Sequence, residues 1–162
     1  MNASMNTRTG TAEPAEANRS AARAGEGGHT PVVVLDTNIV LDLYVFDDPA
    51  ARPVREAVEA GALRWLATAP MREELARVLA YPQIAPRLAF HGRHADEVLA
   101  HFDRWAQQVE PAVKAPITCK DPDDQRFIDL AVANGAKLLS KDRAVLVMHR
   151  RMERLGAQAC RC

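Results

Sequence analysis

One short run of residues does most to limit the folds open to this chain. Residues 32–35 read Val-Val-Val-Leu, an uninterrupted apolar run rich in β-branched side chains. Such a run is typical of a strand buried on both faces, and strands of that kind occur mainly in parallel sheets with helices on each side. The run therefore favours an α/β fold.

Strand-like and helix-like segments alternate along the rest of the chain. Apolar residues at helical spacing, with capping residues or prolines at their starts, predict helices over 37–46, 53–61, 70–79, 95–106 and 121–134. Short apolar runs between them predict further strands over 63–67, 109–113, 138–140 and 157–160. This alternation indicates a parallel α/β sheet.

Length and composition suggest a single domain preceded by a tail. Of the 162 residues, 1–29 include no Val, Ile, Leu or aromatic side chain, so we expect a disordered tail followed by a domain over 30–162. The tail lacks the apolar stretch of a secretion signal, and no segment approaches the ~20 apolar residues of a membrane span. Three cysteines do not make a disulfide framework, which favours a cytoplasmic protein with reduced thiols.

Two aspartates closely follow predicted strands. Asp36 comes after the strand at 32–35, and Asp142 comes just after the one at 138–140. In open α/β sheets, ligands bind outside the carboxyl ends of the strands, so both side chains are expected at the same edge. Each could also cap the helix after it, and for one aspartate alone capping would be the better interpretation. Two at one edge favour a functional site.

Glu74 occupies the apolar phase of the helix predicted over 70–79. It lies three residues after Met71 and four before Val78, on the face expected to meet the sheet. Glu73 points elsewhere and stands four residues before Arg77, as in an ordinary surface ion pair. We therefore assign Glu74 to the site and Glu73 to the surface.

Asp124 shows the same buried phase in a later helix. It lies three residues before Phe127 and four before Ile128. Asp121 is the expected N-cap, and Asp123 falls in the first turn, where a carboxylate interacts well with the helix dipole. Because Asp124 could also be a capping acid, we rank it first and keep Asp121 and Asp123 as supporting or alternate ligands.

Converging carboxylates need a compensating charge, because buried unpaired charges are costly. A hard divalent cation is the usual partner, and Mg²⁺ is held by a few carboxylates together with water and substrate phosphate. The acids therefore predict metal-assisted cleavage of a phosphodiester. Ser140 has no evident histidine partner for a serine triad, and the histidines at 91, 94 and 101 are not spaced as a zinc site.

The chain from Pro31 to about Cys160 resembles a PIN domain, specifically the bacterial branch of toxin–antitoxin toxin components related to VapC ribonucleases. The matching motifs are Val34-Leu-Asp-Thr-Asn38, Glu74-Leu-x-x-Val-Leu79, Cys119-x-Asp-Pro-Asp-Asp-x-x-Phe-x-x-x-Ala131 and Leu138-Leu-Ser-Lys-Asp142. The resemblance implies a three-layer α/β/α fold with a central, mostly parallel sheet.

The resemblance also implies an activity, namely that of a Mg²⁺- or Mn²⁺-dependent endoribonuclease. Its metal would be held by the four acids Asp36, Glu74, Asp124 and Asp142, with Asn38 and Ser140 assisting. The implied partners are an RNA substrate and an antitoxin protein, with a homodimer as a further candidate and no membrane.

Basic residues gather toward the C-terminus, although the whole chain has equal numbers of basic and acidic residues, 21 of each. Residues 137–162 carry seven Lys or Arg against two acids. A basic face near an acidic pocket suits a phosphate backbone, and Lys141, Arg143, Arg150 and Arg151 are the expected RNA contacts. A solvated amphipathic helix with extended arginines explains the same residues equally well.

Two other functions remain open. A haloacid-dehalogenase-like phosphatase also has an Asp after its first strand, but it requires a second Asp two residues later, where this chain has Asn38. A PIN-like domain could instead bind RNA or a partner without cutting it. The intact acid quartet argues against that alternative, since four carboxylates that repel one another are costly to keep without a metal.

Overall fold

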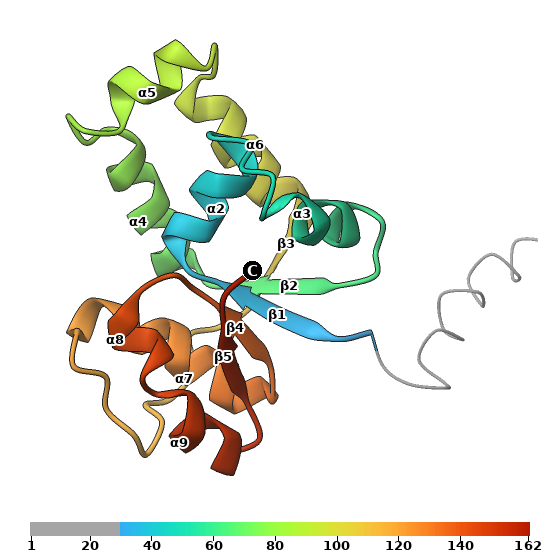
Figure 1. Cartoon of the computed structure of the whole chain (residues 1–162), viewed down its shortest axis with the longest axis vertical. Helices are drawn as coiled ribbons and strands as arrows, with labels where there is room; N and C mark the ends of the chain where they lie inside the picture. Colours follow the sequence, from blue (N-terminus) through green and yellow to red (C-terminus); the bar gives the residue numbers. More distant parts are fainter. Residues whose placement is uncertain (1–29) are drawn as a thin grey trace, which may run out of the picture. The chain divides into compact units, whose positions relative to one another are not determined.

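Five parallel strands form the centre of the molecule (Figure 1). The structure, a computed structural model, describes residues 30–162. The strands are β1 (Val32–Leu35), β2 (Arg64–Ala67), β3 (Ala106–Gln108), β4 (Lys137–Leu139) and β5 (Gln158–Cys160), in the order β3-β2-β1-β4-β5. β1 is central, and its Val33 pairs with Trp65 on one side and Lys137 on the other. This confirms the parallel α/β sheet predicted from the apolar run at 32–35.

Helices cover both faces of the sheet. The connections that lead from β1 to β2 and β3 contain α2 (Thr37–Tyr44), α3 (Arg52–Glu59), α4 (Ala69–Leu79), α5 (Ala85–Phe90) and α6 (Ala95–Trp105). The connections to β4 and β5 contain the 3₁₀ turn η2 (Pro122–Asp124), α7 (Gln125–Asn134), α8 (Arg143–Leu146) and α9 (His149–Arg154). Because parallel crossovers are right-handed, the reversal of direction after β3 places α7–α9 on the face opposite α2–α6, as Figure 1 shows. The result is a three-layer α/β/α fold.

The core lies between these layers, and α2 is its most enclosed helix. Every residue of α2 except Asn38 is buried, including Asp42. Trp65 of β2 is only 1% exposed and packs edge-on against Phe102 of α6 with ring centroids 5.2 Å apart. On the opposite face, Phe127 of α7 is 2% exposed. Burial of this kind contributes roughly 1.5–3 kcal/mol for each large apolar side chain.

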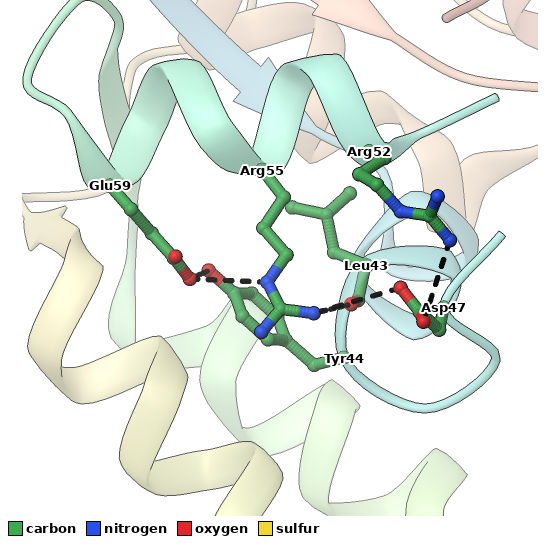
Figure 2. Close-up of polar contacts among 6 residues, drawn as sticks. All are labelled: Leu43, Tyr44, Asp47, Arg52, Arg55 and Glu59. Carbon is green, nitrogen blue, oxygen red and sulfur yellow. Dashed lines mark hydrogen bonds and ion pairs between the residues drawn. The ribbon is translucent and has the colours of Figure 1, made fainter. Parts of the chain in front are cut away.

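A polar network fixes the C-terminal end of α2 against α3 (Figure 2). The Tyr44 hydroxyl donates to Glu59 Oε2 at 3.2 Å, and Arg55 Nε meets the same oxygen at 3.3 Å. Arg55 Nη1 also donates to the carbonyl of Leu43 at 3.4 Å and lies 3.8 Å from Asp47 Oδ1. Burial and the nearby Glu59 charge raise the pKa of Tyr44, so the hydroxyl stays protonated as a donor.

One predicted strand is wrong. Residues 109–113 form no strand; β3 instead occupies Ala106–Gln108, directly after α6 ends at Trp105. β3 is an edge strand whose Gln107 and Gln108 are exposed, so its pairing with β2 does not require the apolar run on which the prediction relied. The ladder stops soon after Val109, whose N–H still donates to the carbonyl of Ala67 at 2.8 Å.

The remaining strands and the longer helices lie within a few residues of their predicted positions. Three short helices, α5, α8 and α9, were given no predicted bounds, because segments of four to six residues show too little periodicity to delimit. A helix after Asp142 was considered only as one that this residue could cap. The predicted tail at 1–29 lies outside the described residues. Among residues 30–162, no helix has the length and apolar character needed to span a membrane.

Candidate metal centre

Asp36 stands where β1 meets α2, and 4% of it is exposed. Its N–H donates to the carbonyl of Leu139 at 3.0 Å, which extends the pairing of β1 with β4. Its side chain accepts a hydrogen bond of 2.6 Å from Ser140 Oγ, a residue with no exposed surface. The sequence places this pair 104 residues apart, and the sheet order brings them together.

The segment after β4 places Asp142 beside Asp36. Ser140 Oγ accepts a hydrogen bond from the N–H of Asp142 at 2.9 Å, so one hydroxyl bridges the two aspartates. Asp142 then caps α8, since its Oδ1 accepts from the N–H of Ala144 at 2.8 Å. β1 and β4 are the neighbours at which the sheet order reverses, and ligands bind in open α/β sheets at such a point.

Asp124 approaches the same point from the end of η2, in the layer of α7–α9. Asp121 caps η2, its Oδ1 accepting from the N–H of Asp123 at 3.0 Å, and the turn directs Asp124 inward, where it is 8% exposed. Among residues 30–162, no group donates a hydrogen bond to Asp124 Oδ2, although that atom is buried. Side-chain oxygens of Asp36, Asp124 and Asp142 all lie within 4.8 Å of one another. We call these three residues the aspartate cluster.

Mutual repulsion and burial perturb the cluster. Burial raises the pKa of Asp124 to about 8, and the hydrogen bond shared with Asp142 and the charges of Asp36, Asp142 and Asp121 act in the same direction. Burial also raises the pKa of Asp36, as does the charge of Asp142, while the bond from Ser140 opposes the rise. Near neutral pH, Asp124 therefore retains a proton that a bound cation would displace.

Glu74 lies close to the aspartate cluster but outside the 4.8 Å group. As predicted, it is half-buried on α4 while Glu73 is exposed. Its Oε1 lies 3.4 Å from Nη1 of Arg126 on α7. Burial and the Asp36 charge raise the pKa of Glu74, whereas the Arg126 charge lowers it. The predicted partner of Glu73, Arg77, forms no ion pair with it in the described part of the chain.

The other predicted site residues have different surroundings. Asn38 is exposed, and its backbone N–H helps to lower the pKa of Asp36. Asp123 is exposed, so it faces water more than the cluster. Arg143 opens α8 next to Asp142 and is exposed, as are Arg150 and Arg151 on α9. Lys141 meets an acid, with its Nζ 2.6 Å from Asp42 Oδ2.

Sequence reasoning overlooked three residues. Asp42 is a lone carboxylate in the otherwise apolar stretch Ile39–Tyr44, a signal that was readable. Arg126 meets Glu74 only through tertiary folding, and no local pattern announces it. Gln125 braces the segment before the acidic motif, accepting from the N–H of Cys119 at 2.7 Å and donating to the carbonyl of Ile117 at 3.0 Å.

A family model described as PIN domain matches residues 32–144, well over half of the chain. The chain belongs to the PIN-domain family. The match runs from β1 into α8 and so includes all four predicted acids. No curated protein matches the sequence.

PIN domains are generally nucleases, and membership of this family sets aside the phosphatase alternative. The donor set agrees, because three carboxylates with an unpartnered buried oxygen could hold a metal ion. The family also suggests RNA binding. The match shows the PIN-domain family and does not assign the chain to the toxin branch.

Proposed function

We propose that this PIN domain is a divalent-metal-dependent endoribonuclease. One observation carries the proposal: three aspartates from separate segments converge at the reversal point of the sheet without a cation from the described chain to neutralise them. A structural cluster would pair its acids with Lys or Arg, as Asp42 is paired with Lys141. The aspartate cluster is therefore arranged for a cation supplied by solvent.

Asp36, Asp124 and Asp142 are the residues proposed to hold that cation, and Glu74 is a candidate fourth ligand once it leaves Arg126. All offer only carboxylate oxygens, which suits Mg²⁺ or Mn²⁺ better than soft metals. When bound, such an ion polarises the scissile phosphate and lowers the pKa of the attacking water. Asp124 must lose its proton first, because only the carboxylate binds the metal.

Ser140 orients the cluster and is not a nucleophile. Its side chain is fully buried, and its hydroxyl is already engaged with Asp36 as donor and with the N–H of Asp142 as acceptor. The residue fixes one carboxylate oxygen of Asp36 and the start of α8 in the same bond network. Asp121 acts indirectly, because its side chain caps the turn η2 that carries Asp124.

The basic residues beyond Asp142 are proposed to hold the RNA backbone. Arg143 directly follows the cluster, and Arg150, Arg151 and Arg154 line a groove of about 490 Å³ between α8 and α9. Within the described chain, the one carboxylate on α9, Glu153, pairs with His149 at 3.3 Å. Lys141 is the weakest of the four predicted RNA contacts, because its ammonium is engaged by Asp42.

We further propose that the biological role is that of a cytoplasmic toxin whose partner is an antitoxin protein, with a homodimer as candidate assembly. What supports this is the set of motifs shared with the VapC-related branch, above all the segment from Cys119 to Ala131. Induced expression of the chain should arrest growth, and co-expression of a small protein encoded by the adjacent gene should relieve the arrest. Growth unaffected by a well-expressed, folded chain would contradict the toxin role.

The activity itself is tested by incubating the purified full chain with an end-labelled single-stranded RNA in Mn²⁺, Mg²⁺, Ca²⁺ or EDTA. We expect internal cleavage in Mn²⁺ or Mg²⁺ and none in EDTA, with a DNA of the same sequence as a control substrate. Binding of the RNA without cleavage in any metal would overturn the proposal and favour the non-cutting PIN-like alternative.

A further inference from the structure

An ion pair joins α2 to Lys141, the residue that precedes Asp142 of the aspartate cluster. Lys141 Nζ is 2.6 Å from Asp42 Oδ2, and the side chain of Asp42 is 7% exposed while that of Lys141 is 44% exposed. Asp42 is the only acid within the segment Ile39–Tyr44, so its burial on α2 depends on this partner. Lys141 stands between Ser140 and Asp142, which both belong to the cluster network.

Two side-chain contacts, which we call ties, therefore join α2 to residues 140–142. At the N-terminal end of α2, Asp36 accepts from Ser140 Oγ at 2.6 Å. One turn and a half later, Asp42 binds Lys141 at the same separation. Between the two ties, the backbone of residues 140–142 carries Ser140 toward β1, Lys141 toward α2 and Asp142 toward α8.

The second tie opposes a force that the cluster creates. Asp36 and Asp142 carry like charges, and side-chain oxygens of the two residues lie within 4.8 Å of each other. Without metal, their repulsion drives residues 140–142 away from α2. The Ser140 hydroxyl alone gives one neutral-donor bond, whereas a charged pair shielded on one side by α2 gives a stronger anchor.

We infer that Asp42 and Lys141 are positioning residues for the metal centre: their ion pair holds residues 140–142 against α2 and so sets the separation of Asp36 and Asp142. The inference rests on the proposed metal-dependent function. It gives Lys141 a role different from RNA contact and assigns a role to Asp42, which no motif of the sequence marks.

The test uses the full chain and a double variant, Asp42→Asn with Lys141→Met. Removing both charges leaves no uncompensated ion, so this variant is expected to fold even if Lys141→Met alone does not. Lys141→Arg keeps the charge and serves as the rescue. The matched control is Arg55→Met with Glu59→Gln, which breaks the polar contacts that α3 makes with Leu43 and Tyr44 of α2 and leaves the Asp42–Lys141 pair intact (Figure 2).

Mn²⁺ affinity is measured by calorimetry in the absence of RNA, together with the melting temperature of each metal-free variant. We expect the double variant to bind Mn²⁺ about tenfold more weakly, the lower end of what loss of an orienting partner costs a metal site. Lys141→Arg should regain most of the affinity. The control should keep full Mn²⁺ affinity even if its melting temperature falls.

Three results would overturn the inference. Unchanged Mn²⁺ affinity in the double variant, with or without a lower melting temperature, would make the pair purely structural. Unchanged Mn²⁺ affinity with weaker RNA binding would make Lys141 an RNA contact. An equal loss in the Arg55→Met, Glu59→Gln control would show that any loosening of α2 suffices. If the unaltered chain binds no Mn²⁺, the proposed function itself fails. This outcome is distinct from the other three, which require a chain that binds Mn²⁺.

Discussion

Two buried aspartates of α2, Asp36 at its N-cap and Asp42 in its last turn, have opposite electrostatic surroundings. Asp36 is 4% exposed and Asp42 is 5% exposed, so burial does not distinguish them. Asp42 meets the ammonium of Lys141 at 2.6 Å. Asp36 meets two further aspartates, and burial together with the charge of Asp142 raises its pKa.

The difference shows how a structural acid can be told from a ligand within one protein. Both aspartates lose hydration, but the fold supplies a cation to Asp42 and a hydroxyl with additional anions to Asp36. A chain that needed both acids only for stability would compensate both. The uncompensated one is therefore the better candidate for chemistry.

The largest difference is expected when the charge of Asp36 or of Asp42 is removed. Asp36→Asn should reduce metal-dependent RNA cleavage more than about a hundredfold, because even orienting partners of metal ligands cost about 10–100-fold. It should also raise the metal-free melting temperature by relieving repulsion. Asp42→Asn should lower that temperature, because it should reduce the free energy of unfolding by about 1–3 kcal/mol. This loss is smaller than the loss from breaking a fully buried ion pair, since Lys141 is 44% exposed. Thermal melts in EDTA and RNA-cleavage assays test both variants, with Glu73→Gln as the control. Melting-temperature shifts of the same sign in the two variants would contradict the distinction between Asp36 and Asp42.

Metal should stabilise the folded protein only through the uncompensated acids. At Mn²⁺ a hundredfold above its Kd, the unfolding free energy should rise by about 2.7 kcal/mol. Asp124→Asn should lose this response, since it removes the carboxylate whose Oδ2 has no hydrogen-bond donor among residues 30–162. The measurement is a denaturant titration with and without Mn²⁺, and a full response in folded Asp124→Asn would move the ligand elsewhere.

The pH dependence should follow the same acid. The pKa of Asp124 is raised from 3.8 to about 8, so the folded state binds more protons than the unfolded state between those values. Metal-free stability should accordingly fall as pH rises from about 4 to 8 and level off above, while Mn²⁺ affinity rises over the upper part of that range. Melting temperatures of the unaltered chain and Asp124→Asn across this range test it; equal slopes would show that other groups are responsible.

Ser140→Ala should weaken the cluster without abolishing it. The change removes a donor to Asp36 and an acceptor for the N–H of Asp142. We expect a loss of about 1–3 kcal/mol in stability, the cost of unsatisfied buried polar groups. The pKa of Asp36 should rise further, because Ser140 now lowers it. Ser140→Thr keeps the hydroxyl, and a phenotype shared by both variants would point to packing instead of hydrogen bonding.

The smallest effect is expected at Glu74. It lies outside the 4.8 Å group and is partly neutralised by Arg126 at 3.4 Å, so Glu74→Gln should reduce Mn²⁺ stabilisation by less than the aspartate changes. Exposed Glu73→Gln should change neither stability nor metal response. Paired melts with and without Mn²⁺ compare them; a response lost in Glu73→Gln and kept in Glu74→Gln would mean that the helix phase was misread.

Local sequence patterns predicted the elements that are buried on both sides. They did not predict the features that depend on tertiary contacts. The run at 32–35 and the phase of Glu74 needed only periodicity. β3 could not be placed, because its polar edge residues are selected by pairing with β2 and not by burial. The common edge of Asp36 and Asp142 was expected from strand order, and the inward phase of Asp124 from helical spacing. The Lys141–Asp42 and Arg126–Glu74 pairs are tertiary contacts that local spacing does not indicate.

The bond between Ser140 and Asp36 spans 104 residues, and this has a consequence for synthesis of the protein. A ribosome releases Asp36 long before it releases β4, and β4 must pair with β1 before the carboxylates meet. A nascent chain that lacks residues 140–142 therefore carries Asp36 and Asp124 without the complete centre. If the finished protein cuts RNA, a nascent chain cannot do so before these residues have left the ribosome.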